Sequence, residues 1–257
     1  MKNIFLLFSL IPLFLSCSHE KQFPDYLTQK VSKEQLTANL PDTMSGNFKK
    51  DSRHVSYQSA DCLNQVTTSV NYYIERNPDF NFKRFVINWN ECKDEITYSD
   101  LNEMELEKWI EATGLLLQLT SDARYAEELE KIFYHTSSNT IKKEVAGYAI
   151  TKNVDHLHVN LFIPAKIQYE HSLKGSVSML METSYPEKGK VDLIFNMEKK
   201  RYVELFIRIP SWAKDAHVTA EGVKYLAPPG GYCKIARQWK EGDSVQIIFP
   251  LHDRENN

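Results

Sequence analysis

Several classes of protein need features that this chain has little of. It contains only nine glycines in 257 residues, and no glycine-rich loop of the kind that cradles phosphate is visible. Lysine and arginine number 31 against 34 acidic residues, which gives a formal net charge of −3 and no basic stripe for a nucleic acid. The composition, 42% hydrophobic and 25% charged, is that of a globular protein. We therefore expect one large or two small domains and no nucleic-acid partner.

Cysteine is also scarce. The four cysteines are Cys17, Cys62, Cys92 and Cys233, and no pair has the C-x-x-C spacing, so neither a disulfide framework nor a zinc knuckle is indicated. The three that follow Cys17 are an odd number. Their spacing is compatible with one Cys62–Cys92 bridge and equally with three buried thiols.

The N-terminus holds a short apolar run, Ile4 to Leu15, after Lys2. This pattern predicts a signal peptide over residues 1–16, because the run is shorter than the roughly 20 residues that span a bilayer. Cys17 follows Leu15-Ser16 and resembles the cysteine of a bacterial lipobox, although Phe14 stands where leucine is usual. We expect a protein of the cell envelope, lipid-anchored through Cys17 to a bacterial membrane. The alternative is an ordinary secretory signal with an incidental cysteine.

The chain downstream of Cys17 begins with a polar stretch. Residues 17–60 contain the breakers Pro24, Pro41 and Gly46 and no sustained period, which predicts a lipidated tether. After cleavage the chain carries 30 basic against 34 acidic residues, a net charge of −4. Membrane attachment is therefore expected to depend on acyl chains and not on a basic patch.

Helical periodicity follows over residues 61–140. Apolar residues at helical spacing predict helices over about 61–77, 99–120 and 123–134. Ser99 and Asp122 are the candidate N-caps of the second and third. The last two helices, joined by a short turn at residues 120–122, predict an αα-hairpin.

The period changes to two after residue 140, which predicts a β-sandwich over 141–257. The expected strands are 156–163, 176–183, 190–197, 202–209, 215–219, 231–236 and 244–249. The fold class expected from the sequence is therefore α+β, with helices followed by an antiparallel sandwich.

Four ordered motifs in the β half resemble the middle region of glycoside hydrolase family 127 (GH127), the β-L-arabinofuranosidase-like enzymes. They are VNLFIPA (159–165), SYPEKGKV (184–191), LFIRIPSWA (205–213) and GYCKIARQWKEGDSVQIIFPL (231–251). The segment LLLQLTSDARYAEELEKIFYH (115–135) is similar to the last helices of that family's catalytic barrel. The resemblance implies helical hairpins of a partial (α/α)6 barrel, followed by the sandwich.

Most motif residues have a structural interpretation. Arg208 and Trp212 flank Pro210 at a strand end, where a ring can plug the sandwich and an arginine can hold a loop carboxylate. The alternative for Trp212 or Trp239 is contact with a sugar.

The resemblance also implies where catalysis would occur. Enzymes of the family use a cysteine nucleophile near a zinc ion held by further cysteines and a glutamate, with a second glutamate as general acid/base. The motif Tyr-x-Glu-Thr-Cys corresponds to the segment from Tyr98, where the glutamate and cysteine fall on Asp100 and Asn102, or on Asn102 and Met104. The nucleophile segment Cys-Cys-Pro-Pro-Asn corresponds to residues 137–155, which contain no cysteine. The zinc ligands are therefore not retained, and no cofactor is expected.

The length of the helical part also indicates that the catalytic barrel is incomplete. A twelve-helix barrel needs about 190 residues, whereas about 120 lie between Cys17 and Ser137. The sequence predicts an incomplete barrel.

Two other sets of residues are candidates for chemistry. Glu91, beside Cys92, is a candidate acid/base group, and the alternative is an exposed surface glutamate. His156 and His158 lie two apart on one strand, a spacing that zinc sites use, and a solvated strand face explains them equally well.

Two functions follow from these expectations. The first is a GH127-like exported lipoprotein related to β-L-arabinofuranosidases that act on plant-type arabinosides, incomplete as a catalyst or completed by another chain. The alternative is a non-catalytic carbohydrate-binding or accessory surface lipoprotein, with glycan as partner.

Overall fold

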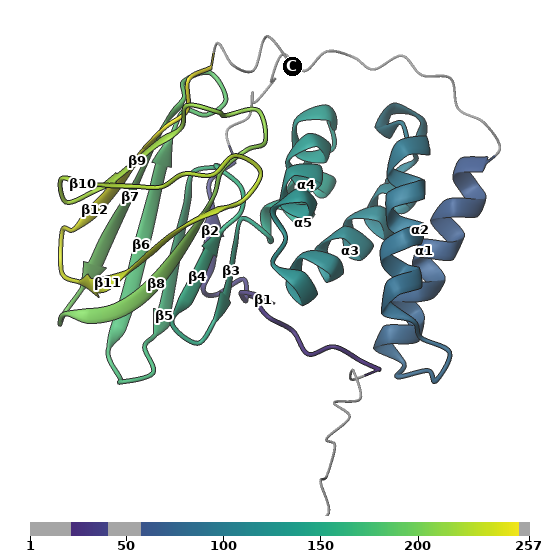
Figure 1. Ribbon diagram of the computed structural model, residues 1–257, viewed down its shortest axis with the longest axis horizontal. Coiled ribbons are helices and arrows are strands. Elements are labelled where there is room, and N and C mark those ends of the chain that lie inside the picture. Colours follow the sequence, from purple (N-terminus) through teal and green to yellow (C-terminus); the bar gives the residue numbers. More distant parts are fainter. Residues whose placement is uncertain (1–21, 41–57, 252–257) are drawn as a thin grey trace, which may run out of the picture.

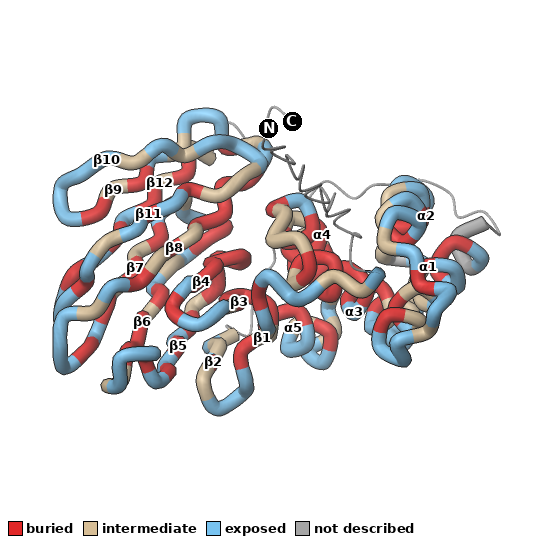
Figure 2. Tube along the Cα trace, turned by 60° about the horizontal axis from the view of Figure 1, so that its bottom comes forward, coloured by how far each residue is buried: buried red, intermediate tan, exposed pale blue. Residues whose placement is uncertain are grey.

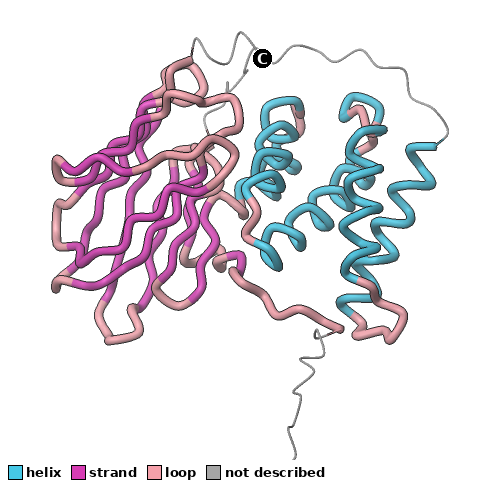
Figure 3. The backbone as a smooth tube through the Cα atoms, in the orientation of Figure 1, coloured by secondary structure: helices cyan, strands magenta, loops and turns pink. Residues whose placement is uncertain are grey.

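The computed structural model describes residues 22–40 and 58–251. The predicted signal peptide and Cys17 lie outside this range. Helices and strands are segregated side by side: the helical part occupies one side of the molecule and a β-sandwich the other (Figure 3). The predicted α+β class, with helical hairpins followed by an antiparallel sandwich, is confirmed. None of the helices in the described ranges combines the length and apolar character that crossing a membrane requires.

The helical part is built around one central helix. Its elements are α1 (Gln58–Ile74), α2 (Phe82–Glu95), a 3₁₀ turn η1 (Tyr98–Asp100), α3 (Glu103–Thr120), α4 (Ala123–His135) and α5 (Asn139–Ala146). Helix α3 is buried on most of its surface, because α1 and α2 pack on one side of it and α4 and α5 on the other. Leu115, Leu116 and Leu117 are therefore all buried, although no single apolar stripe contains them.

Capping residues explain where the helices begin. Asn102 accepts a hydrogen bond from the backbone N–H of Glu105, whose carboxylate accepts one from the N–H of Asn102, which together form a capping box. The predicted cap at Ser99 is wrong, because residues 98–100 form the separate turn η1. The predicted cap of α4 is confirmed: the Asp122 side chain accepts from the N–H of Arg124.

Helix α2 is not among the helices predicted from the sequence. Its buried residues Phe85, Asn88, Trp89 and Cys92 follow the helical spacing i, i+3, i+4, i+7. The side chain of Asn81 caps its N-terminus, and α1 and α2 form a hairpin whose turn lies at residues 75–81.

Two sheets form the sandwich. Sheet A has the order β1-β3-β4-β8-β11 and sheet B the order β10-β9-β12-β7-β6-β5-β2. All pairings are antiparallel except that of β4 with β8. The strands are β1 (Gln29–Lys30), β2 (Leu36–Ala38), β3 (Ile150–Asn153), β4 (His156–Val159), β5 (Ala165–Glu170), β6 (Ser176–Thr183), β7 (Lys190–Met197), β8 (Arg201–Arg208), β9 (His217–Ala220), β10 (Val223–Tyr225), β11 (Tyr232–Trp239) and β12 (Ser244–Ile248).

Alternating burial along the strands places the core between the sheets (Figure 2). In β7, Val191, Leu193 and Phe195 are buried, and the residues between them are exposed or half-buried. Period-two alternation predicted β6 and β7 with the bounds found. The predicted strand 156–163 is shorter, because β4 ends at Val159.

The predicted tether over 17–60 is wrong for its described part. Gln29 and Lys30 pair with β3 in sheet A, and Leu36–Ala38 pair with β5 in sheet B. Thr28, Val31 and Leu36 are buried. Residues 22–40, which we call the strap, run from the end of the α1–α2 hairpin to both sheets (Figure 1). Val31 and Leu36 reach the core, whereas Tyr26 and Leu27 are exposed. Strands as short as β1 and β2 take their stability from the sheets they join.

Candidate functional site

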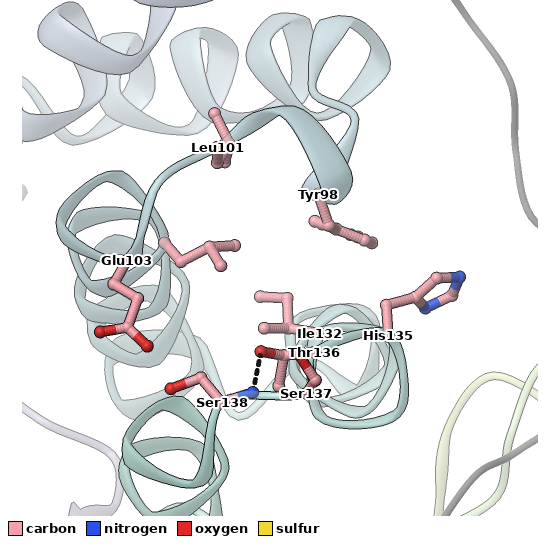
Figure 4. Close-up of a pocket in the computed structure, with 9 residues that line it drawn as sticks. Tyr98, Leu101, Glu103, Ile132, His135, Thr136, Ser137 and Ser138 are labelled. Carbon is pink, nitrogen blue, oxygen red and sulfur yellow. Dashed lines mark hydrogen bonds between the residues drawn. The ribbon is translucent and has the colours of Figure 1, made fainter.

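A pocket of about 240 Å³ lies where η1, α3, α4 and α5 meet. Its lining comes from two segments of the chain, Tyr98–Leu106 and Ile132–Ser138 (Figure 4). The lining residues are Tyr98, Leu101, Glu103, Leu106, Ile132, His135, Thr136, Ser137 and Ser138.

Short turns position the polar groups. Helix α4 ends at His135, and Thr136 adopts extended backbone. The Thr136 hydroxyl accepts a hydrogen bond from the N–H of Ser138 at 3.1 Å (Figure 4). The Ser138 side chain in turn accepts from the N–H of Ile141 and so caps α5. The tight link between two helices places three successive hydroxyl side chains beside the pocket, with the carboxylate of Glu103 on the facing helix.

Tyr98 is held from beneath the pocket. Its hydroxyl donates to the carboxylate of Glu128, which is only 2% exposed. Trp109 Nε1 donates to the same oxygen at 3.3 Å. Burial and then the Glu128 charge raise the pKa of Tyr98 well above its ordinary value. The phenol therefore stays neutral and presents its ring as a fixed wall.

His135 is turned away from the pocket centre. Its Nδ1 donates to the carbonyl oxygen of Lys131 at 2.7 Å, and its ring centroid lies 5.5 Å from that of Tyr98. Figure 4 shows the ring directed away from the other lining residues. The histidine thus borders the pocket without presenting a base to its centre.

The pocket lies where the family resemblance places the zinc and nucleophile segments. Tyr98 and Ser137 open the two corresponding segments, and both line it. The positions aligned with the metal-binding cysteine do not: Asn102 caps α3, and Met104 is 60% exposed. The lining offers a phenol, a carboxylate, an imidazole and three hydroxyls, and none of its side chains is a thiol.

These donors do not fit the zinc site of the family. A structural or catalytic zinc needs three or four closely placed nitrogen, thiolate or carboxylate ligands. Over residues 22–40 and 58–251 no group of three or more His, Cys, Asp or Glu is placed to hold a metal ion. We therefore derive no catalytic step through zinc.

The disulfide decides between the two states left open for the cysteines. Cys62 and Cys92 are bonded to each other, with their Cα atoms 5.2 Å apart, and join α1 to α2. Cys233 is a buried free thiol in β11, and burial raises its pKa to about 11. Each cysteine within the described ranges is thus either oxidised or protonated at neutral pH.

Glu91, the predicted acid/base candidate, is exposed on α2. It does not line the pocket, so the structure does not bring it together with Tyr98 or Glu103. Its catalytic role stays a prediction.

The two histidines of β4 have different surroundings. His156 is exposed, and its Nε2 lies 3.7 Å from a Glu204 oxygen. His158 is 8% exposed and stacks face to face on Phe206, with ring centroids 4.3 Å apart. The solvated-face interpretation is therefore right for His156 and wrong for His158.

Because His158 is buried, we expect it to make stability depend on pH. Burial, and to a lesser degree His156, lower its pKa to about 4. The unfolded chain, with a histidine pKa near 6.5, binds the proton first as the pH falls, so the stabilisation is complete above about pH 6.5 and is lost toward pH 4. Between pH 7 and 5 the loss should be about 1–2 kcal/mol.

Urea unfolding at both pH values, with the wild type and His158→Phe, measures this effect. Phenylalanine keeps a ring against Phe206 and cannot take the proton. The variant should lose less stability on acidification than the wild type does. Equal losses would show that His158 does not contribute.

The motif residues of the sandwich are structural. Arg208 is fully buried, and its Nη2 lies 2.8 Å from Glu130 Oε1 in α4. The predicted carboxylate partner thus exists, on a helix and not on a loop. Trp239 is buried and donates from Nε1 to the Val203 carbonyl, which leaves no face for a sugar. Trp212 is half-buried and packs against Phe249.

Glu128 is not among the residues predicted from the sequence, although the sequence holds a signal for it. It lies among buried residues of α4 at helical spacing, with Tyr125, Leu129 and Ile132. A carboxylate on an apolar helix face needs partners, and a buried hydrogen-bonding site is the usual reason for one.

One family model matches the β-sandwich of this chain. The sequence model described as "Beta-L-arabinofuranosidase, GH127 middle domain" matches residues 156–251. This part of the chain is therefore similar to the GH127 middle domain, as its motifs predict. A comparison with curated proteins gives no match.

Three solved structures share the fold. One, described as a glycoside hydrolase, has a TM-score of 0.58 at 17% identity and covers 74% of this chain and 46% of its own. A GH127 β-L-arabinofuranosidase from Geobacillus stearothermophilus T6 has a TM-score of 0.54 and 20% sequence identity, and the match covers 73% of this chain and 41% of that enzyme. A GH127 β-arabinofuranosidase has a TM-score of 0.57 and 15% sequence identity, and the match covers 74% of this chain and 42% of that enzyme.

Two facts follow from these coverages. The matched share of this chain is larger than the sandwich alone, so the likeness of fold extends into the helical part. The chain spans less than half the length of these three structures.

Proposed function

We propose that this chain is an exported lipoprotein that binds arabinoside-type glycans at the pocket and does not cleave them by the cysteine-dependent route of the family. The observation that carries the proposal is the pocket itself. It is formed by the two segments that correspond to the family's zinc and nucleophile motifs, and it is lined by hydroxyl, carboxylate and aromatic groups.

The lining suits a sugar. Thr136, Ser137 and Ser138 supply hydroxyls, and the Glu103 carboxylate accepts hydrogen bonds from neutral donors. The fixed ring of Tyr98 and the side chains of Leu101 and Ile132 supply apolar surface. A few polar groups that fix orientation within an otherwise apolar concavity are typical of small-molecule sites.

Cleavage needs more than binding. Glycoside hydrolysis uses two carboxyl groups, or a thiolate and an acid, on opposite sides of the scissile bond. Glu128 is already committed to Tyr98 and Trp109, and Cys92 is committed to Cys62. These contacts support a binding role over a hydrolytic one.

Export is supported by the disulfide. Such bonds persist in oxidising compartments outside the cytosol, and Cys62–Cys92 is buried between two helices. Together with the apolar run before Cys17, this supports a lipid-anchored protein of the bacterial cell envelope.

Replacing Cys17 by alanine should move the protein from the membrane fraction to the soluble exported fraction, and unchanged membrane partition would contradict the anchor.

Glycan binding is tested by titrating the purified chain with an aryl β-L-arabinofuranoside in a calorimeter. We expect saturable binding. Ser137→Trp fills the pocket from an exposed position and should weaken binding at least about tenfold, a loss of about 1.4 kcal/mol.

Ser244→Trp places the same side chain on an exposed position of β12 and should leave the affinity unchanged. An absence of binding to the wild type, or equal affinities for both variants, would overturn the proposed site.

A further inference from the structure

The start of the strap is fixed to the turn of the α1–α2 hairpin. Gln22 Nε2 donates to the carbonyl oxygen of Pro78, and the Tyr73 hydroxyl donates to the carbonyl oxygen of Pro24 at 2.9 Å. Phe23 stacks on Phe80, with ring centroids 5.5 Å apart. The start of the strap therefore has a defined place on the folded body, beside the turn between α1 and α2, which lies at the lower end of the helical part in Figure 1.

The distance from this place to Cys17 is short. Four residues lie between Cys17 and Gln22, so the two are five residue steps apart, and an extended chain covers at most about 3.6 Å per step, or about 18 Å in all. A lipidated Cys17 lies at the membrane surface, where the headgroup region alone is about 5–8 Å thick. The hairpin turn cannot then be far from the bilayer.

Charge distinguishes the two ends of the hairpin. We call residues 74–84 together with strap residues 22–26 the turn end. It carries three bases and three acids: Arg76, Lys83, Arg84, Asp25, Glu75 and Asp79. The opposite end of the hairpin, where α1 begins and α2 ends, carries one base and four acids: Lys93, Asp61, Glu91, Asp94 and Glu95. An anionic lipid surface repels the opposite end and not the turn end.

Exposed apolar side chains lie at the turn end as well. Ile74 is 59% exposed and Tyr26 is 39% exposed, and the Tyr26 ring packs edge-on against Tyr73. Tyrosine is enriched at membrane surfaces, where its ring lies at headgroup level. Both residues lie at the same end of the helical part as Gln22, which is the described residue nearest to Cys17.

We propose that the turn end of the α1–α2 hairpin rests on the bilayer into which the acyl chains of Cys17 insert. This inference rests on the lipid anchor of the proposed function. It sets the distance of the pocket from the membrane: α2 begins at Phe82 beside the turn and ends at Glu95, three residues before Tyr98, and 14 helical residues span about 21 Å. The pocket, which Tyr98 lines, therefore lies about one helix length from the end that rests on the bilayer.

The test uses the full-length protein purified from membranes and reconstituted in vesicles of phosphatidylcholine and an anionic phosphatidylglycerol. A fluorophore is attached to Asp79→Cys at the turn end or to Glu95→Cys at the opposite end, both exposed positions. Lipids with a headgroup spin label quench dyes that lie near the membrane surface. We expect at least twofold stronger quenching at position 79 than at position 95, and equal or reversed quenching would overturn the docking.

Charge reversal provides a second readout. Lys83→Glu with Arg84→Glu should reduce the quenching at position 79 on anionic vesicles. The matched pair Lys142→Glu with Lys143→Glu, on α5, should leave it unchanged; equal effects of the two pairs would contradict charge-directed docking.

Mass spectrometry of the same preparation separates the two levels of the proposal. Absence of acyl chains on Cys17 would overturn the anchor and the docking together. A lipidated protein without the expected quenching difference would overturn the docking alone.

Discussion

Replacing Glu130 by glutamine should lower the free energy of unfolding by about 3–5 kcal/mol, because it leaves a buried cation without its counter-ion. Arg208 has no solvent exposure, and its Nε also donates a hydrogen bond to the Asn160 carbonyl oxygen at 2.6 Å. Burial is the largest influence and works to lower the pKa of the Arg208 guanidinium, but the Glu130 carboxylate, with smaller contributions from Tyr185, Glu127 and Tyr232, offsets it, so the pKa is raised. Glutamine keeps the shape of the side chain and removes only the charge.

Glu127 on the same helix provides the control for this experiment. Its carboxylate accepts hydrogen bonds from the N–H and hydroxyl of Ser211 at a partly exposed position. Glu127→Gln should cost less than about 1 kcal/mol. Urea unfolding of both variants makes the comparison. If Glu130→Gln costs no more than Glu127→Gln, the buried ion pair does not hold α4 to the sandwich.

Removing the disulfide by Cys62→Ala with Cys92→Ala should cost about 3–4 kcal/mol. The bond closes a loop with a sequence separation of 30. Closing a loop of that length lowers the conformational entropy of the unfolded chain, which raises the free energy of the unfolded state by about this amount. The loop contains most of α1 and nearly all of α2, so the loss should fall on the hairpin that carries the turn end.

A reducing agent provides the internal control for the disulfide. It should lower the stability of the wild type to that of the double variant and leave the double variant unchanged. Identical stability of the wild type with and without reductant, where labelling shows that the thiols have been freed, would contradict a stabilising role for the bond.

Elements with strong local signals could be predicted from the sequence. Buried apolar side chains recur at every second position in β6 (Val177, Met179, Met181) and β7 (Val191, Leu193, Phe195), and Asp122 gives a local capping signal for α4. The strap could not be predicted in this way, because β1 and β2 have two and three residues and are strands only through their partners. Helix α2 was missed despite a helical spacing of its buried residues, which include the polar Asn88.

The site was partly predictable, because its two segments carry recognisable local sequence. The family resemblance located both segments that line the pocket and showed that they lack cysteine. It did not locate the support beneath them, because Tyr98 and Glu128 are 30 residues apart and meet only when η1 packs on α4. The acid/base candidate Glu91 stands beside Cys92, whose sulfur is bonded to Cys62 in the hairpin and not directed to the pocket segments.

The most direct test of the account is release of arabinose from an aryl β-L-arabinofuranoside by the purified chain, with and without added zinc. The account predicts a rate no higher than that of buffer, because the pocket offers no thiol and the Cys62–Cys92 bond leaves none in the hairpin. Zinc-dependent release that Cys92→Ser or Glu91→Gln lowers by at least about 10²-fold, the scale of an acid/base group, would contradict it.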